Sequence, residues 1–229
     1  MQLTIDRVRQ LGAAAGIAFL ILGAVSLFLP GTAPTANEVA KITPYLVDKR
    51  GSILASDFLL GLAFMFFLLF LGALRTHLGA TDREGVRPGA TALAGGVAAT
   101  VLVLAGTAVT NAAAFQVASA GDIPLNHALY DVANDLFFLS GFGFAAFFIG
   151  AGLAGASTGA LPVALASTAY AVALLNILGA VGLFAKSGFF AIGGAFGYIA
   201  PLASLLWILA VCIMLLRPAS AGRVRTTST

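Results

Sequence analysis

"ILASDFLLGLAFMFFLLFLGAL", residues 53–74, is an apolar run with a single carboxylate, Asp57, near its start. A transmembrane helix needs about 20 predominantly apolar residues to cross a hydrocarbon core about 30 Å thick. This run therefore predicts a membrane-spanning helix. The aspartate raises a question, because an ionisable group inside a bilayer is costly and usually has a function.

The whole chain has the composition of a membrane protein. Its 229 residues are 60% hydrophobic and 9% charged, with a mean hydropathy of +1.01. Soluble domains carry about 25% charged residues, because their surface must be wetted. We therefore predict an all-α, polytopic bundle of six transmembrane helices. It forms a single integral membrane domain over residues 1–229, with the lipid bilayer as its principal partner.

Turn-forming residues and charges divide the apolar sequence into six predicted spans. Their approximate ranges are 11–30, 52–74, 90–118, 130–155, 160–184 and 195–216. The start of the last span is ambiguous, because residues 186–200 could also form a re-entrant or interfacial piece. The first span has the basic start of a signal peptide, but its apolar region exceeds the roughly 7–15 residues typical of a cleaved segment. We expect it to be retained.

Basic residues predict the orientation of the spans, since loops rich in Lys and Arg stay in the cytoplasm. On the side of the termini lie Arg7, Arg9, Arg75, Arg83, Arg87, Arg217, Arg223 and Arg225. On the other side lie Lys41, Lys49, Arg50 and Lys186. The larger set predicts a multi-pass protein of the plasma membrane with both termini cytoplasmic. Because the basic residues are scattered over short loops and tails, we expect no nucleic-acid partner.

Asp57 has a counterpart further along the chain. "SDFLLGLAFMFFLLFLGA", residues 56–73, aligns with "NDLFFLSGFGFAAFFIGA", residues 134–151, so that Asp57 meets Asp135 and both segments end in Gly-Ala. The shared Phe residues weigh little in a chain with 18 of them. We interpret the match as a tandem duplication, with chance similarity between apolar helices as the alternative.

The duplicated unit would be a helical hairpin. The candidate repeats are residues 11–75 and 90–155. Because two spans separate the copies, the repeats would run in the same direction through the membrane. The last two spans are a weaker candidate for a third copy, with Ser204 in place of the aspartate.

The second acid lies in the densest polar patch, "GDIPLNHALYDVANDLFF", residues 121–138. Asp122 followed by Pro124 predicts a helix N-cap that lies outside the lipid. His127 and Asp131 are four residues apart and share a helix face. Asn134 returns to nearly the same line, and Asn111 of the preceding span could face the same region. The candidate binding residues are Asp57, Asn111, His127, Asp131, Asn134 and Asp135.

Several interpretations of this set stay open. The helix macrodipole favours acids in a first turn, so a solvated helix end with one ion pair is the simplest. The His–Asp pair could instead bind a divalent cation together with Asp57, relay protons, or line a cavity for a solute. We assign no metal ligands, and the sequence identifies no cofactor. Tyr45, Tyr198 and Trp207 are expected to be interfacial or packing aromatics.

Enzymatic chemistry is the least favoured class, and no catalytic residue is assigned. "GASTG", residues 155–159, matches the GxSxG pattern and suggests a rhomboid-type intramembrane serine protease. His77 is predicted in an inner loop and His127 at the far outer end of its span, while Ser157 falls in an inner turn, so we expect no nucleophile–base pair.

Two functional hypotheses follow. The first is a protein that binds or passes a small solute or ion through an outward-facing polar vestibule. The second is a non-enzymatic accessory or structural subunit that packs through Gly- and Ala-rich helices, against a second copy or within a larger complex. It draws on the GxxxG pairs Gly12/Gly16 and Gly193/Gly197. Cys212, the single cysteine, is predicted to be a small apolar residue.

One long segment resembles known sequences. "HALYDVANDLFFLSGFGFAAFFIGAGLAGASTGALPVALASTAYAVALLNILGA", residues 127–180, resembles a loose group of uncharacterised bacterial multi-pass membrane proteins. In that group a Phe- and Gly-rich span is followed by a short turn, a Leu-Pro and another span. The resemblance implies the hairpin fold and carries no activity.

Overall fold

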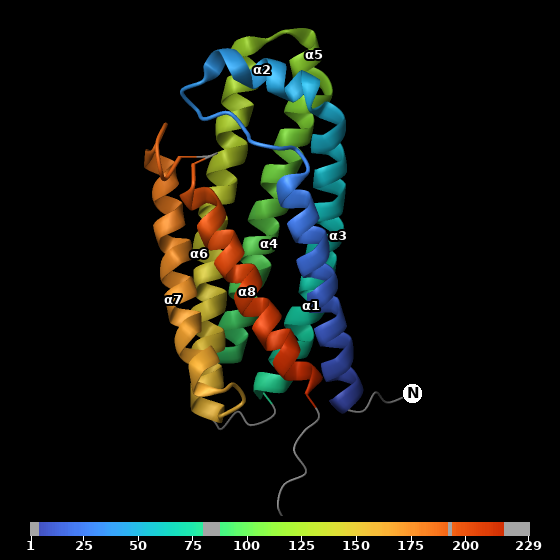
Figure 1. Ribbon diagram of the computed structural model, residues 1–229, viewed down its shortest axis with the longest axis vertical. Coiled ribbons are helices and arrows are strands. Elements are labelled where there is room, and N and C mark those ends of the chain that lie inside the picture. The colour runs from blue at the N-terminus through green and yellow to red at the C-terminus, as the bar shows by residue number, and fades with distance from the viewer. Residues whose placement is uncertain (1–4, 80–87, 192–193, 218–229) are drawn as a thin grey trace, which may run out of the picture.

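A computed structural model describes residues 5–79, 88–191 and 194–217, and every regular element in these ranges is a helix (Figure 1). The six long helices are α1 (Ile5–Phe28), α3 (Arg50–Gly79), α4 (Pro88–Ala112), α6 (Ile123–Thr158), α7 (Val163–Gly179) and α8 (Phe196–Leu216). Shorter elements are α2 (Val39–Asp48), the π-helical η1 (Ala113–Val117), α5 (Ala118–Ala120) and the 3₁₀-helical η2 (Ala180–Phe184). Within the described ranges, six helices are long and apolar enough to cross a membrane, which confirms the predicted class.

The bundle has two distinct ends (Figure 1). At the terminal end, where α1 begins and α8 finishes, Arg9 Nη2 donates to the carbonyl of Arg217 at 3.3 Å. At the opposite end, which we call the cap end, α2 lies across the bundle. The helices α1, α4 and α7 run toward the cap end, and α3, α6 and α8 run back. The two candidate hairpins therefore run in the same direction, as a tandem duplication requires, and the repeat itself stays a prediction.

The spans have unequal lengths. Those of α1, α7 with η2, and α8 have 23, 22 and 21 residues, whereas those of α3, α4 through α5, and α6 have 30, 33 and 36. At 1.5 Å per residue the short spans match a hydrocarbon core of about 30 Å, and the long spans exceed them by about 10–20 Å. Figure 1 shows this excess at the cap end, where α3, α4 and α6 rise beyond the other helices to meet α2.

The early start of α6 follows from its cap. Asp122 Oδ1 accepts a hydrogen bond from the backbone N–H of Leu125 at 3.1 Å, and proline occupies the first turn. This confirms the predicted N-cap. The connection before α8 consists of turns over the described residues 185–191 and 194–195, with an extended residue at Ala185 and a positive φ at Gly188.

Small residues set the packing of α4 against α6. A Cβ on Gly143 would lie 2.6 Å from the backbone N of Ala99, and one on Gly150 would lie 2.9 Å from the Cα of Ala92. Helices in a bilayer associate through such close backbone approach rather than by hiding apolar surface from lipid. The Gly12/Gly16 pair acts in the same way between α1, α3 and α8, since a Cβ on Gly16 would meet the Phe70 ring at 2.9 Å. Gly193 lies outside the described residues.

Two apolar clusters fill the interior. The central cluster lies between the long helices, and its aromatic members are Phe19, Phe64, Phe67, Phe70, Phe147, Phe148 and Trp207. The cap cluster lies beneath α2 and comprises Ile42, Leu46, Ile53, Ala113, Ala114, Ala118 and Tyr130. Trp207 is a packing aromatic, as expected: its ring meets Phe147 edge-on at 5.9 Å, and its Nε1 donates to the carbonyl of Leu165.

Candidate functional site

The segment from Leu29 to Asp48, which we call the strap, is held over the cap end by three side chains near the start of α6. The contacts are Tyr130 Oη to the Pro34 carbonyl (2.7 Å), Asn126 Nδ2 to Thr43 Oγ1 (3.3 Å) and His127 Nε2 to the Ala36 carbonyl (3.3 Å). The strap also buries two apolar side chains of its own in the cap cluster, because Ile42 and Leu46 of α2 are 1% and 0% exposed. The strap is therefore a packed part of the fold.

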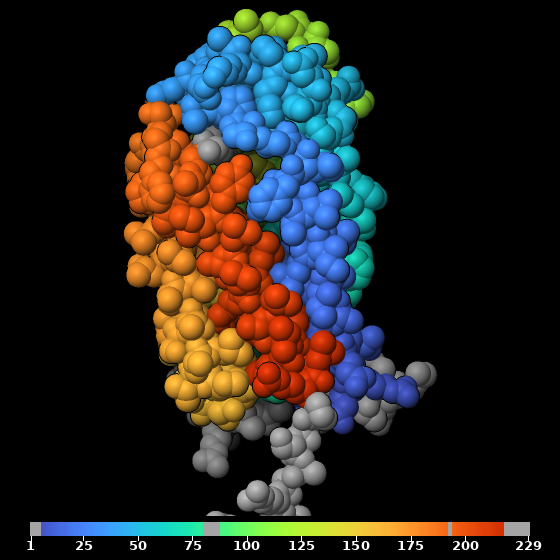
Figure 2. Space-filling view, in the orientation of Figure 1, coloured from blue at the N-terminus to red at the C-terminus, as the bar shows by residue number. Residues whose placement is uncertain are grey.

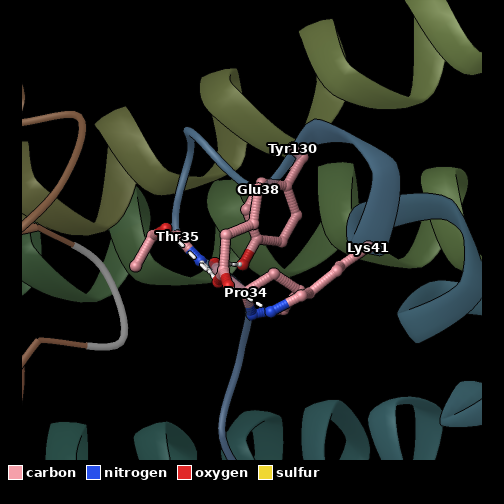
Figure 3. A network of polar contacts seen from close by, with 5 residues as sticks. All are labelled: Pro34, Thr35, Glu38, Lys41 and Tyr130. Carbon is pink, nitrogen blue, oxygen red and sulfur yellow. Dashed lines mark hydrogen bonds and ion pairs between the residues drawn. The ribbon is translucent and has the colours of Figure 1, made fainter.

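A local network shapes the strap where it enters α2 (Figure 3). Glu38 accepts hydrogen bonds from the backbone N–H and the hydroxyl of Thr35 at 3.0 and 3.3 Å, and it pairs with Lys41. The hydrogen bond from Lys41 is the largest influence that holds the pKa of Glu38 below its usual value. Glu38 is thus a carboxylate at neutral pH with its partners in place, and it belongs to the turn rather than to a free site.

Beneath the cap cluster lies a layer of polar side chains from three helices. Asp57, Asn111 and Asn134 each lie one helical turn deeper than a cap-cluster residue of the same helical segment, on the same face. The cap-cluster residues are Ile53, Ala114 and Tyr130, respectively. We call Asp57, Asn111 and Asn134 the polar layer.

Each member of the polar layer has a buried polar atom without a hydrogen-bond partner among the described residues. The atoms are Asp57 Oδ2, Asn111 Oδ1 and Asn134 Nδ2. Asp57 also takes no part in the close acid–base pairs of the described chain, which are Asp6–Arg9, Glu38–Lys41 and His127–Asp131, the last an ion pair only when His127 is protonated. Leaving a buried polar group unsatisfied costs about 1–3 kcal/mol. Three such atoms in one layer therefore favour a polar ligand or solvent at this position.

Tyr45 of α2 is partly buried and packs against the cap cluster. Burial raises the pKa of Tyr45 to about 12, and the negative charges of Tyr198 and Asp57 add to the effect. The Tyr45 phenol is therefore within electrostatic reach of both Asp57 and the α8 residue Tyr198.

The structure divides the six candidate residues into two groups. Asp57, Asn111 and Asn134 turn toward the interior. His127 and Asp131 pair with each other at 3.6 Å, with side chains 33% and 44% exposed, and Asp135 is exposed. Within the described ranges, no three His, Cys, Asp or Glu residues are grouped to hold a metal ion. The divalent-cation interpretation of His127, Asp131 and Asp57 therefore gains no support.

The two acids of the candidate repeat share a height but not an environment. Asp57 and Asp135 are almost equally far from the ends of their helices, which lie at Gly79 for α3 and at Thr158 for α6. At 1.5 Å per residue both acids are about 33–35 Å from the terminal end, close to the edge of a hydrocarbon core about 30 Å thick. At this height the exposed Asp135 can reach water or lipid headgroups, whereas Asp57 has one oxygen buried in the bundle.

Sequence reasoning missed two contributors on α6, Asn126 and Tyr130. Asn126 is 0% exposed, and its Oδ1 has no partner among the described residues. The signal was present in the spacing, because Asn126, Tyr130 and Asn134 recur every four residues and so define one face.

A surface hollow of about 350 Å³ opens between the cap ends of α1 and α8 (Figure 2). It is lined by Leu27, Phe28, Gly31, Thr32 and Tyr198. The rings of Phe28 and Tyr198 are nearly parallel, at 4°, with centroids 6.4 Å apart.

Comparison of the chain with protein-family models, with curated proteins and with solved structures finds no match. The chain is an integral membrane protein by the length and composition of its own helices. No relative supplies an activity, so the function has to be derived from the residues of the site.

Proposed function

We propose that the protein binds a small polar solute or cation in the polar layer, reached from the cap end. The observation that carries this proposal is the Asp57 carboxyl group, which has a buried oxygen and no partner among the described residues, while two amides lie beneath the same cap cluster. A buried carboxylate is unfavourable unless it is paired or hydrogen-bonded. A bound cation or hydrogen-bond donor would satisfy it.

Binding is better supported than passage across the membrane. Below the polar layer, Phe64 and Phe67 of α3 pack against Phe144 of α6 with ring centroids 6.4 and 6.1 Å apart. These rings belong to or border the central cluster, which is close-packed between the helices. A solute in the polar layer would meet this apolar barrier, and passage would require the cluster to separate.

The accessory-subunit hypothesis stays a prediction, and one of the two small-residue pairs behind it is used inside this chain. It depended on small-residue pairs that could dock onto another protein, but Gly12 and Gly16 pack against α3 and α8 of this chain. Gly143 and Gly150 of α6 likewise pack against the backbone of α4, so they offer no free surface to another protein. Assembly with a second copy also stays a prediction, and no particular surface of the described residues supports it.

The repeat provides a matched pair of variants to test the proposal. The full-length protein, in lipid nanodiscs, would be heated in the presence of Na⁺, K⁺, Ca²⁺, ammonium ions, choline and neutral polar solutes. A ligand that binds only the folded state raises the free energy of unfolding, by about 2.7 kcal/mol at a hundredfold excess over its Kd. The unfolding temperature rises with it. We expect at least one ligand to stabilise the wild type and Asp135→Asn, but not Asp57→Asn.

The control separates a specific site from surface charge, because both substitutions remove one carboxylate at the same height. If no ligand stabilises the wild type, or if Asp57→Asn responds as the wild type does, the polar layer is not a binding site and the proposal is wrong.

A further inference from the structure

The hollow between α1 and α8 has no role in the proposal above, and its position suggests one. Phe28 lies in the last turn of α1 and Tyr198 in the first turn of α8. Counted at 1.5 Å per residue, Phe28 is about 35 Å and Tyr198 about 27 Å from the terminal end, a range that includes Asp57. The hollow and the polar layer thus lie at the same height.

Direct contacts place the hollow beside the helix that carries Asp57. Ser56 Oγ donates to the carbonyl of Ser26 at 2.7 Å, and both serines are buried. Ser26 immediately precedes the lining residue Leu27, and Ser56 immediately precedes Asp57.

We infer that this hollow is a lateral entrance to the polar layer, and that the ligand carries an organic ammonium group. The inference rests on the proposed function and specifies its ligand class. Phe28 and Tyr198 line the hollow with nearly parallel rings, and the helix that carries Asp57 is joined to α1 beside it by the Ser56–Ser26 hydrogen bond.

The chemistry of the lining selects this class. An ammonium group is attracted to the face of an aromatic ring within about 6 Å of its centroid. Two of the lining residues, Leu27 and Phe28, are purely hydrocarbon, while Thr32 and Tyr198 offer hydroxyl groups. A bare inorganic ion would lose its hydration here with few oxygens to replace it, whereas an alkylated ammonium ion carries its own apolar surface.

Charge and size agree with the same class. Asp57 has no basic partner among the described residues, so an anion would meet repulsion rather than a counter-charge. The volume of the hollow, about 350 Å³, is small for a ligand site. Pockets for small ligands begin at roughly 300 Å³ and extend to about three times that size. The hollow therefore suits a compact ion such as choline.

An ammonium group could come from a free solute or from the headgroup of an ethanolamine or choline phospholipid. Both share the chemistry that the hollow recognises. The hollow opens between two helices with lipid-facing side chains, since Phe28 and Ile199 are 60% and 39% exposed. The test therefore has to include both sources.

The test measures choline and tetramethylammonium binding by calorimetry, with the full-length protein in nanodiscs of phosphatidylglycerol, which has no ammonium group. We expect Phe28→Leu to weaken choline binding by about three- to thirtyfold, because the leucine keeps the bulk but loses the ring face. Asp57→Asn should abolish measurable binding. Phe184→Leu, at an aromatic residue that is 88% exposed elsewhere, should leave the affinity unchanged.

A second set of nanodiscs containing phosphatidylethanolamine identifies the source. Weaker apparent choline affinity there assigns the site to a lipid headgroup, and an unchanged affinity assigns it to a free solute; both outcomes support the inference. Absent choline binding, or equal affinity in the wild type and Phe28→Leu, overturns it. If an inorganic cation or a neutral solute still stabilises the protein through Asp57 in that case, the proposed function stands and only the ligand class is wrong.

Discussion

Asp57 is the residue on which the candidate site depends, and a neighbouring phenol can report its charge. Burial is the largest cause that raises the pKa of Tyr45 to about 12, with Tyr198 and Asp57 as further causes. We predict that Asp57→Asn lowers the Tyr45 pKa, but leaves it above the ordinary value of about 10 because burial persists. The measurement is the phenolate absorbance of each protein between pH 9 and 13 (a range of about four units around the expected midpoint).

The Tyr45 signal is isolated by subtracting the titration of Tyr45→Phe in the same background. Asp135→Asn is the matched control and should leave the midpoint where it is, because that carboxylate is exposed and is not among the causes acting on Tyr45. An equal midpoint in Asp57→Asn and the wild type would show that Asp57 has no influence on the Tyr45 pKa. One argument for the polar layer would then be lost.

At the same scale, the sequence located the polar patch but could not resolve which way its members face. Asn134 is 8% exposed and its neighbour Asp135 is exposed. Adjacent helical residues are rotated by about 100° from each other, so they cannot share a face. Composition and proximity grouped the two, whereas the four-residue spacing from Asn126 through Tyr130 points to Asn134 alone. His127 and Asp131, predicted to pair, do so.

At the scale of the elements, the contact between α4 and α6 can be tested with glycines that the candidate repeat aligns. A Cβ on Gly150 would lie 2.9 Å from both the Ala92 Cα and the Pro88 carbonyl oxygen, whereas one on Gly72 meets nothing within 4 Å. We predict that Gly150→Ala destabilises the protein by about 1–3 kcal/mol, because backbone atoms cannot yield without separating the helices.

Gly72→Ala is the control, and it should stabilise the protein by up to about 1 kcal/mol through the higher helix propensity of alanine. Both free energies of unfolding can be measured in the same detergent by denaturant titration. A loss of stability that is the same in both variants would mean that α4 and α6 are not in backbone contact at Gly150.

The sequence predicted the long helices far better than the strap. An apolar run of about 20 residues is a strong signal because the bilayer itself dictates that length. The ten-residue α2 is too short to give such a signal, and residues 31–51 were expected only as a connection. Its buried residues, Ile42 and Leu46, are one helical turn apart, but so brief a pattern is common by chance. Tertiary contacts with α6 decide its position.

At the scale of the whole molecule, the unequal spans determine where the site stands. The three short spans are long enough to cross the hydrocarbon core, and α3, α4 and α6 extend beyond it at the cap end (Figure 1). The polar layer lies near this boundary, where lipid gives way to headgroups and water. The combination of a packed centre with a capped polar end supports the proposal that a ligand reaches the polar layer from one side of the membrane.

Which side that is depends on the orientation, which the basic residues predict. Among the described residues, Arg7, Arg9, Arg75 and Arg217 lie toward the terminal end, while Lys41, Lys49, Arg50 and Lys186 lie toward the cap end. The remaining arginines of the predicted inner set, Arg83, Arg87, Arg223 and Arg225, lie outside the described residues. With all of them counted, the positive-inside rule predicts a cytoplasmic terminal end and a polar layer on the outer side.

Single cysteines can test this orientation in whole cells. Cys212 is 0% exposed, so the wild type should give a silent background with a membrane-impermeant maleimide. We predict that Asp48→Cys, at an exposed position of α2, is labelled in intact cells, and that Thr76→Cys, exposed near the terminal end, is labelled only after permeabilisation. The reverse pattern would put the polar layer on the cytoplasmic side, and its ligand would then have to come from inside the cell.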